Sequence, residues 1–230
     1  MKRVWHILTL LLLLSSGAIV WIGIPQAPPP PPPAAPKSDG ALQLAIPPIN
    51  FYYVRHGETD SNLKNIVQGL LDTSLNKTGF KQAEEAARHI KDLPITTIIT
   101  SPLKRARETA KIIADAIDVP VVIVGELKDR SAGILEGKPQ ERWMEKWKTD
   151  KMYIDKAETF QNFSHRVERG LAKALKEPGP ILIVAHSGVY TAINKILGAH
   201  AKDYLPNAQV LLYKAPLAAP DKGTWTASEA

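Results

Sequence analysis

The pattern of hydrophobic and polar positions divides the chain into three parts. Val4 to Ile24 is a run without a charged residue, dominated by Leu, Ile, Val and Trp. The next part is rich in proline, with an unbroken tract from Pro28 to Pro33. From Ile46 onward, short β-rich runs alternate with segments whose apolar residues recur every three or four positions, as on one face of a helix. The pattern predicts a membrane anchor or signal segment at residues 1–25, a linker at 26–45 and a folded domain at 46–230.

The first segment has two interpretations. It contains about the 20 apolar residues that a transmembrane helix needs. It could instead be a cleaved signal peptide, with Ile7 to Leu14 as the apolar core and Ser16-Gly17-Ala18 as the cleavage site. The apolar run continues as far as Ile22, beyond that site, which favours the anchor.

Both interpretations place the domain outside the cytoplasm. Lys2 and Arg3 precede the apolar run, and positive residues stay on the cytoplasmic side. The domain is therefore expected on the extracytoplasmic (periplasmic) side, tethered to the membrane or secreted after cleavage. The proline tract predicts a stiff polyproline II spacer, although it could instead recruit a protein partner.

The sequence pattern of the folded domain predicts an α/β fold. Alternating strands and helices are typical of a three-layer α/β/α sandwich with a mostly parallel sheet. In the helix expected at 78–93, Phe80, Ala83, Ala87 and Ile90 recur at three- and four-residue spacing. The predicted strands are Ile49–Val54, Ile95–Thr100, Val119–Val124, Ile181–Ala185 and Val210–Tyr213, and the predicted helices are Thr78–Leu93, Lys104–Ile117, Pro139–Lys148, Phe160–Leu175 and Val189–Leu197.

Composition removes several classes of chemistry. The chain has no cysteine, which excludes a disulfide framework, a thiolate metal site and a cysteine nucleophile. Its formal charge of +6 suits an anionic substrate. Since no aromatic residues are interleaved with a basic stripe, a nucleic-acid partner is not expected.

Three polar clusters follow predicted strands, namely Arg55-His56, Ser101-Pro102 and His186-Ser187. The carboxyl ends of parallel strands lie at one edge of a sheet, where ligands of such folds bind. Each cluster alone has a structural explanation: a charged turn, a helix start with Ser101 as its cap, or a packed histidine. Arg105 in the first turn of a helix opposes the helix dipole, which indicates a nearby anion. Together the clusters predict one anion-binding site.

The order of these motifs resembles the histidine phosphatase superfamily, also called phosphoglycerate-mutase-like. The resemblance extends over about residues 48–225 and is specific because many motifs occur in the expected order. They are Arg-His-Gly-Glu-Thr at 55–59, Asn62, Gln68-Gly69, Asp72–Asn76, Thr78-Gly79, Gln82-Ala83, Ser101–Ala110, Leu127–Arg130, Gly133–Gly137 and Val184–Val189.

The resemblance implies a phosphohistidine mechanism without a metal or another cofactor. His56 would be the nucleophile, with its other ring nitrogen held by a backbone carbonyl. Arg55, Arg105 and a protonated His186 would stabilise charge on the phosphoryl oxygens. The remaining phosphate-binding residues would be Asn62, Gln68, Gly69 and Ser187.

Asp129 occupies the position expected for the general acid. The family usually has Glu there, and aspartate is one methylene shorter. Glu126 and Glu136 are alternatives, although Glu136 is more typical of a carboxylate that fixes a loop. The weaker match at this position leaves a membrane-tethered phosphate-binding module with little turnover as an alternative function.

The chain length between motifs favours hydrolysis over a mutase reaction. Only 57 positions (186 − 129) separate Asp129 from His186, which leaves little chain to enclose an intermediate and exclude water. We therefore expect a phosphatase that acts on a small phosphorylated substrate. Trp143 and Trp147 could line its entrance or form the apolar face of a covering helix. The sequence identifies neither the substrate nor the oligomeric state.

Overall fold

The computed structural model describes residues 45–141, 143–216 and 224–230. The predicted anchor at 1–25 and all but the last residue of the predicted linker at 26–45 lie outside the described residues. Among the described helices, none has the length and apolar character needed to span a bilayer. The elements are β1 (Phe51–Arg55), α1 (Asp60–Leu63), α2 (Lys77–Ile90), β2 (Thr97–Thr100), α3 (Lys104–Ile117), β3 (Val121–Ile123), α4 (Trp143–Lys148), α5 (Phe160–Ala174), β4 (Ile181–Ala185), α6 (Ser187–Leu197), β5 (Val210–Lys214) and β6 (Thr226–Glu229), with single turns of 3-10 helix at Gly125–Leu127 and Gly133–Leu135.

The sheet is mixed, whereas the sequence predicted a mostly parallel one. Its strand order is β3-β2-β4-β1-β5-β6. The first four strands are parallel to their neighbours, as predicted. β5 is antiparallel to β1, and β6 is antiparallel to β5. The sequence did not predict β6, because this polar edge strand is mostly exposed and carries no hydrophobic alternation.

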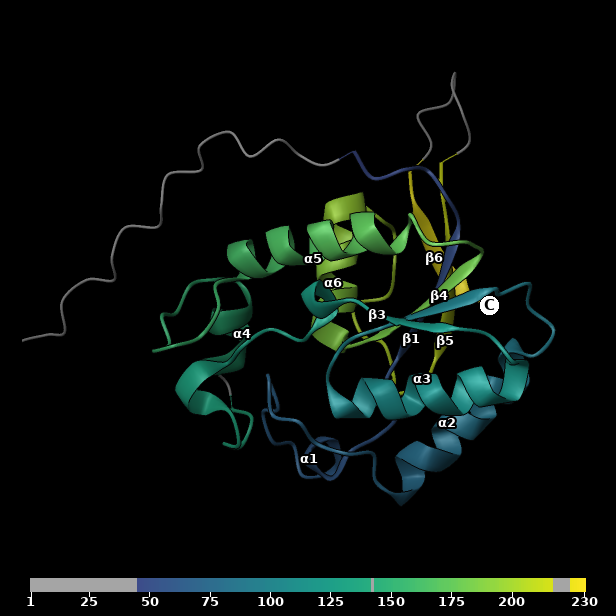
Figure 1. Ribbon diagram of the computed structural model, residues 1–230. Coiled ribbons are helices and arrows are strands. Elements are labelled where there is room, and N and C mark those ends of the chain that lie inside the picture. The colour runs from purple at the N-terminus through teal and green to yellow at the C-terminus, as the bar shows by residue number, and fades with distance from the viewer. Residues whose placement is uncertain (1–44, 142, 217–223) are drawn as a thin grey trace, which may run out of the picture. The chain divides into compact units, whose positions relative to one another are not determined.

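Helices cover both faces of the sheet, as predicted. α2 and α3 lie on one face, and α5 and α6 on the other (Figure 1). Successive residues of a strand point to opposite faces, so β1 contributes to two cores. Tyr52 and Val54 pack with α2 and α3, whereas Phe51 and Tyr53 pack with α5 and α6.

The buried face of α2 differs from the prediction at one position. Phe80 belongs to the apolar spacing of the predicted helix but is 42 % exposed, and Gly79 is buried instead. A β-carbon at Gly79 would lie 2.0 Å from the Glu58 carbonyl oxygen, so the helix presses its first turn against the loop after β1. The periodicity missed this contact because glycine carries no hydrophobic signal.

Trp147 belongs to a small core on α4. It is 7 % exposed and packs with Val67, Ala132 and Ile154. The Arg130 guanidinium lies 4.3 Å above its ring. Of the two open interpretations, the structure favours core packing for Trp147, whereas the side chain of Trp143 is outside those described.

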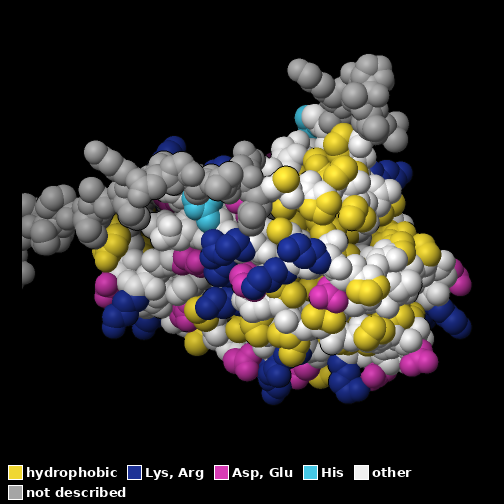
Figure 2. Space-filling view, turned by 45° about the horizontal axis from the view of Figure 1, so that its top comes forward, with side chains coloured by type: hydrophobic (Ala, Val, Ile, Leu, Met, Phe, Trp, Pro, Cys, Tyr) yellow, Lys and Arg dark blue, Asp and Glu magenta, His cyan; other side chains and the backbone are white. Residues whose placement is uncertain are grey.

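Basic surface residues lie beside acidic ones. Figure 2 shows this on one face, where Lys and Arg side chains have Asp and Glu side chains between or next to them. Lys173 pairs with Glu126, and Lys202 lies 2.8 Å from Glu229. The positive charge is therefore partly neutralised locally at these positions.

Candidate active site

The three polar clusters meet because their strands are neighbours. β4 lies between β1 and β2, and Arg55 pairs with Ala185 in the register. The His56 amide donates to the Ala185 carbonyl at 2.9 Å, and the Ser101 amide donates to the Val184 carbonyl at 3.1 Å. The chain ends of β1, β2 and β4 thus deliver the predicted residues to one edge of the sheet.

His56 is held in a defined tautomer. Its Nδ1 lies 2.7 Å from the Gly57 carbonyl oxygen, which can only accept, so Nδ1 carries the proton and Nε2 has the free lone pair. This is the backbone contact predicted from the sequence. Burial lowers the pKa of His56 well below its usual range, and Arg105 and Arg55 lower it further. The imidazole is therefore neutral and nucleophilic at neutral pH.

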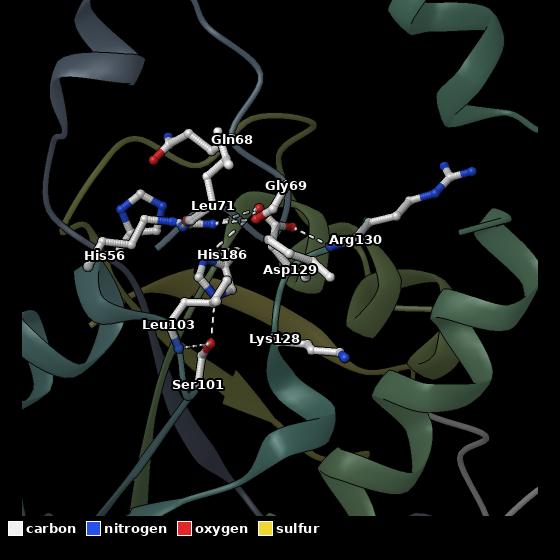
Figure 3. Close-up of polar contacts among 12 residues, drawn as sticks. His56, Gln68, Gly69, Leu71, Ser101, Leu103, Lys128, Asp129, Arg130 and His186 are labelled. Carbon is white, nitrogen blue, oxygen red and sulfur yellow. Dashed lines mark hydrogen bonds and ion pairs between the residues drawn. The ribbon is translucent and has the colours of Figure 1, made fainter. Parts of the chain in front are cut away.

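His186 faces His56, with ring centroids 5.3 Å apart. Its Nε2 lies 2.7 Å from Ser101 Oγ, and its Nδ1 lies 4.0 Å from Asp129 Oδ2 (Figure 3). Burial lowers the pKa of His186 well below its usual range, and the positive charges of Arg105 and Arg55 lower it further. The lowered pKa contradicts the expectation of a protonated His186, because burial disfavours the charged imidazolium and the two arginines add positive charge.

Arg105 is fully buried, and its guanidinium is fixed on both sides. Nη1 donates to the Leu71 carbonyl at 2.8 Å and Nη2 to the Gly69 carbonyl at 3.0 Å. Nη2 also lies 3.4 Å from Asp129 Oδ2. These contacts explain how a cation is tolerated in the first turn of α3.

Arg55 is anchored by the loop that precedes β5. Its Nη1 donates to the Leu205 carbonyl at 2.8 Å and to Tyr204 Oη at 3.2 Å. The loop before β5 therefore sets the direction of this guanidinium.

Asp129 is the carboxylate that the structure brings to the site. Its Oδ1 accepts from the Arg130 amide at 2.9 Å (Figure 3). Burial raises the pKa of Asp129, although Arg105 opposes the shift. The two alternatives lie elsewhere: Glu126 pairs with Lys173 at the surface, and Glu136 Oε1 accepts from the Leu70 and Ala132 amides at 3.0 and 3.1 Å. Glu136 is thus the loop-fixing carboxylate that its position suggested.

The remaining predicted residues have different roles in the geometry. Asn62 Oδ1 accepts from the Thr59 amide at 3.1 Å and caps α1. Gln68 Oε1 accepts from Thr59 Oγ1 at 3.0 Å, which leaves the amide group as a donor, and Gly69 acts through its carbonyl on Arg105. Ser187 follows His186 at the start of α6, and its carbonyl accepts from Thr191 within that helix at 3.1 Å. That contact does not link Ser187 to the other residues.

Sequence reasoning missed several supporting contacts. Asn207 Nδ2 donates to the His56 carbonyl at 2.8 Å, and Thr109 Oγ1 accepts from the Gly57 amide at 3.0 Å. Ser101 was considered as a helix cap, but α3 begins after Leu103 without a side-chain cap, and Ser101 contacts His186. Thr109 lies within a recognised motif, whereas no local pattern marked Asn207.

Within the described part of the chain, three buried nitrogen atoms of these residues have no hydrogen-bond partner, namely Arg55 Nε, Arg105 Nε and His186 Nδ1. A buried donor without a partner costs about 1–3 kcal/mol. A ligand with several acceptor oxygens would satisfy such donors, and phosphoryl groups suit guanidinium geometry. The arrangement can therefore bind a phosphoryl group beside two neutral imidazoles and a protonatable carboxylate.

Comparison with known proteins identifies the same family as the sequence motifs. The model of the histidine phosphatase superfamily (branch 1) matches residues 51–214. The "Uncharacterized phosphatase PhoE" of Bacillus subtilis (strain 168) is 40 % identical over 149 residues, covering 63 % of this chain and 76 % of that protein. The "Probable phosphoglycerate mutase GpmB" of Yersinia pestis (strain Pestoides F) is 32 % identical over 168 residues, covering 67 % of this chain and 78 % of that protein.

A solved structure shows the same fold. The crystal structure of the alpha-ribazole phosphatase from Shigella flexneri superposes with a TM-score of 0.65 at 25 % sequence identity. The superposition covers 79 % of this chain and 95 % of that one.

Proposed function

Because the chain belongs to the histidine phosphatase superfamily (branch 1), we propose that it hydrolyses phosphomonoesters through a phosphohistidine intermediate on His56. Relatives of this chain are named phosphatases, which agrees with a phosphoric monoester hydrolase. The observation that carries the proposal is the neutral His56 beside the unpartnered nitrogen atoms of Arg55, Arg105 and His186.

The first chemical step transfers the phosphoryl group to the enzyme. His56 Nε2 attacks phosphorus and the bond to the ester oxygen breaks, while Asp129 gives its proton to that oxygen. Arg55 and Arg105 stabilise the charge on the three phosphoryl oxygens, and His186 donates a hydrogen bond through Nδ1. Burial favours both roles, since it lowers the pKa of His56 and raises that of Asp129.

The second step returns the enzyme to its starting state. Asp129, now ionised, takes a proton from water as the water oxygen attacks the phosphohistidine. The bond from phosphorus to Nε2 breaks, and inorganic phosphate leaves with His56 neutral again. Proton and phosphoryl group therefore balance over the cycle.

A mutase reaction is the second candidate, because a relative carries that name. The short chain between Asp129 and His186 supports hydrolysis, since water can reach the intermediate. Incubation with 3-phosphoglycerate distinguishes the two. We expect release of inorganic phosphate, and conversion to 2-phosphoglycerate without release would favour the mutase.

We also propose that the domain is tethered on the extracytoplasmic side of a membrane. The support is the uncharged run of Val4 to Ile24 after Lys2 and Arg3, followed by the proline tract. The full chain should then sediment with membranes and be digested by protease added to spheroplasts. A soluble, shortened mature form would instead indicate a cleaved signal peptide.

The test of the catalytic proposal replaces the nucleophile. His56→Ala should lower hydrolysis of phenyl phosphate to background and abolish an acid-labile phosphoenzyme, because neither step can occur without the imidazole. His89→Ala, on an exposed histidine of α2, is the matched control and should remain active. Equal rates for wild type and His56→Ala would instead support a phosphate-binding module.

A further inference from the structure

Arg166 of α5 lies against the segment that carries Asp129. Its Nη1 donates to the Glu126 carbonyl at 2.7 Å and to the Lys128 carbonyl at 2.9 Å. Its Nη2 donates to the carbonyl of Asp129 itself at 3.0 Å. One guanidinium therefore holds three carbonyl groups of a segment that is neither long helix nor strand.

Glu158 fixes Arg166 from the other side. Its two carboxylate oxygens accept from Nε at 3.0 Å and from Nη2 at 2.7 Å, a forked pair in which both side chains are less than a fifth exposed. The main chain of Glu158 adds two contacts, donating to the Ser131 carbonyl at 3.0 Å and accepting from Arg130 Nε at 2.8 Å. Such forked, charge-assisted pairs have a defined geometry.

The carboxyl group of Asp129 has little room for displacement. A β-carbon on Gly188 would lie 2.6 Å from Asp129 Oδ1, so the start of α6 approaches it closely. Aspartate has a short side chain, and the position of its main chain therefore decides where the carboxyl lies. A general acid must lie within hydrogen-bond distance of the leaving oxygen, and a displacement of about 1 Å can cost on the order of 10²-fold in rate.

We propose that Arg166, held by Glu158, is a positioning residue that places the general acid Asp129 against the leaving group. This inference rests on the proposed phosphatase function and names the residue that places the short side chain of Asp129 for proton transfer. Arg166 contacts backbone and carboxylate oxygens and its guanidinium lies 5.1 Å from the Phe163 ring, so a purely structural role is the competing explanation.

Two substrates distinguish these explanations. Phenyl phosphate has a leaving group that needs a proton, whereas 2,4-dinitrophenyl phosphate has one that leaves without it. A positioning defect should lower kcat/KM for the first substrate far more than for the second, because only the first depends on the acid. General damage to the fold should lower both alike.

The variants are Arg166→Lys and Arg166→Gln, each compared with Asp129→Asn. Lysine keeps the charge but cannot contact Glu158 and three carbonyls with one planar fork. We expect a loss of about 10-fold or more in kcat/KM for phenyl phosphate and less than about 3-fold for the dinitrophenyl ester, a smaller version of the Asp129→Asn pattern. Arg169→Gln, an exposed arginine one turn along α5, is the control and should match wild type.

Glu158→Gln keeps the test decisive if neither Arg166 variant folds, because it weakens the pair while Arg166 can still bind the carbonyls. It should give the same selective loss at a smaller size. An equal loss on both substrates, or no loss, in a variant with wild-type thermal unfolding would overturn the proposal. A His56→Ala enzyme that retains activity would contradict the phosphatase mechanism itself, independently of Arg166.

Discussion

At the scale of single residues, burial assigns the chemical roles. Loss of hydration disfavours any charged form, so the same environment lowers the pKa of His56 and raises that of Asp129. The nucleophile is thereby shifted toward its neutral form and the acid toward its protonated form. Arg105 strengthens the first effect and opposes the second, which keeps the Asp129 proton transferable.

Asp129→Asn tests this assignment. We expect kcat/KM for phenyl phosphate to fall by about 10² to 10⁴-fold, because the amide cannot give up a proton. In wild type, activity on this substrate should decline as pH rises through the Asp129 pKa, which lies above the usual aspartate value. The variant should lose that decline in a pH–rate profile. Glu126→Gln, at the surface pair with Lys173, should leave both rate and profile unchanged, and the reverse result would make Glu126 the acid.

The sequence predicted which residues form the site, but it did not predict all of their pKa shifts. His56 lies at a strand end and Arg105 at a helix start, whereas Asp129 was identified from the order of the family motifs alone. The low pKa of His186 was not predictable, because it results first from burial and then from two arginines, and both arise only when the fold brings distant elements together. Asn207 was missed for the same reason: its contact with His56 joins positions 151 residues apart.

At the scale of elements, close packing of backbone places the nucleophile loop. Gly57 and Gly79 face each other, and a β-carbon on Gly57 would lie 2.4 Å from the Gly79 carbonyl oxygen. The Gly79 amide in turn donates to the α2 cap Asn76 at 2.8 Å. The start of α2 therefore supports the loop that carries His56.

Gly79→Ala should disturb both stability and activity. The new β-carbon would lie 2.0 Å from the Glu58 carbonyl oxygen, so the loop must move, at a cost of about 1–3 kcal/mol. We expect a lower midpoint in urea unfolding and a lower kcat/KM. Gly125→Ala is the control, since nothing lies within 4 Å of its added β-carbon. If Gly79→Ala behaves like Gly125→Ala, the support by α2 is unimportant.

Element boundaries were predictable where periodicity and burial agree. The helix at 104–117 and the strand at 181–185 were predicted with the bounds observed, and both bury a continuous apolar face. The exposure of Phe80 was not predictable, because the start of α2 packs through the backbone of Gly79. β6 was not predictable either, because it is held by pairing with β5 and carries no hydrophobic pattern. The antiparallel direction of β5 likewise depends on the route of the preceding loop, which periodicity does not encode.

At the scale of the whole molecule, the buried site links catalysis to pH-dependent stability. His56 and His186 both have pKa values lowered mainly by burial. Above about pH 6.5 both imidazoles are neutral in the folded and the unfolded chain, so they contribute no pH dependence. Below that pH the unfolded chain binds protons that the folded chain refuses. Stability should therefore fall as the pH decreases, by up to about 1.4 kcal/mol per pH unit for each histidine.

His56→Ala isolates one of these contributions. Other buried groups also gain protons as the pH falls, notably Asp129, whose raised pKa acts in the opposite direction. The difference between wild type and variant removes most of that shared background. Urea unfolding at several pH values between 7.5 and 5 should give a slope shallower in His56→Ala by about 1 kcal/mol per pH unit below pH 6.5. The matched control is His89→Ala, which removes a histidine whose side chain is 70 % exposed. A wild-type slope in His56→Ala would mean that folding does not lower the pKa of His56, and burial would then not be what keeps this imidazole neutral.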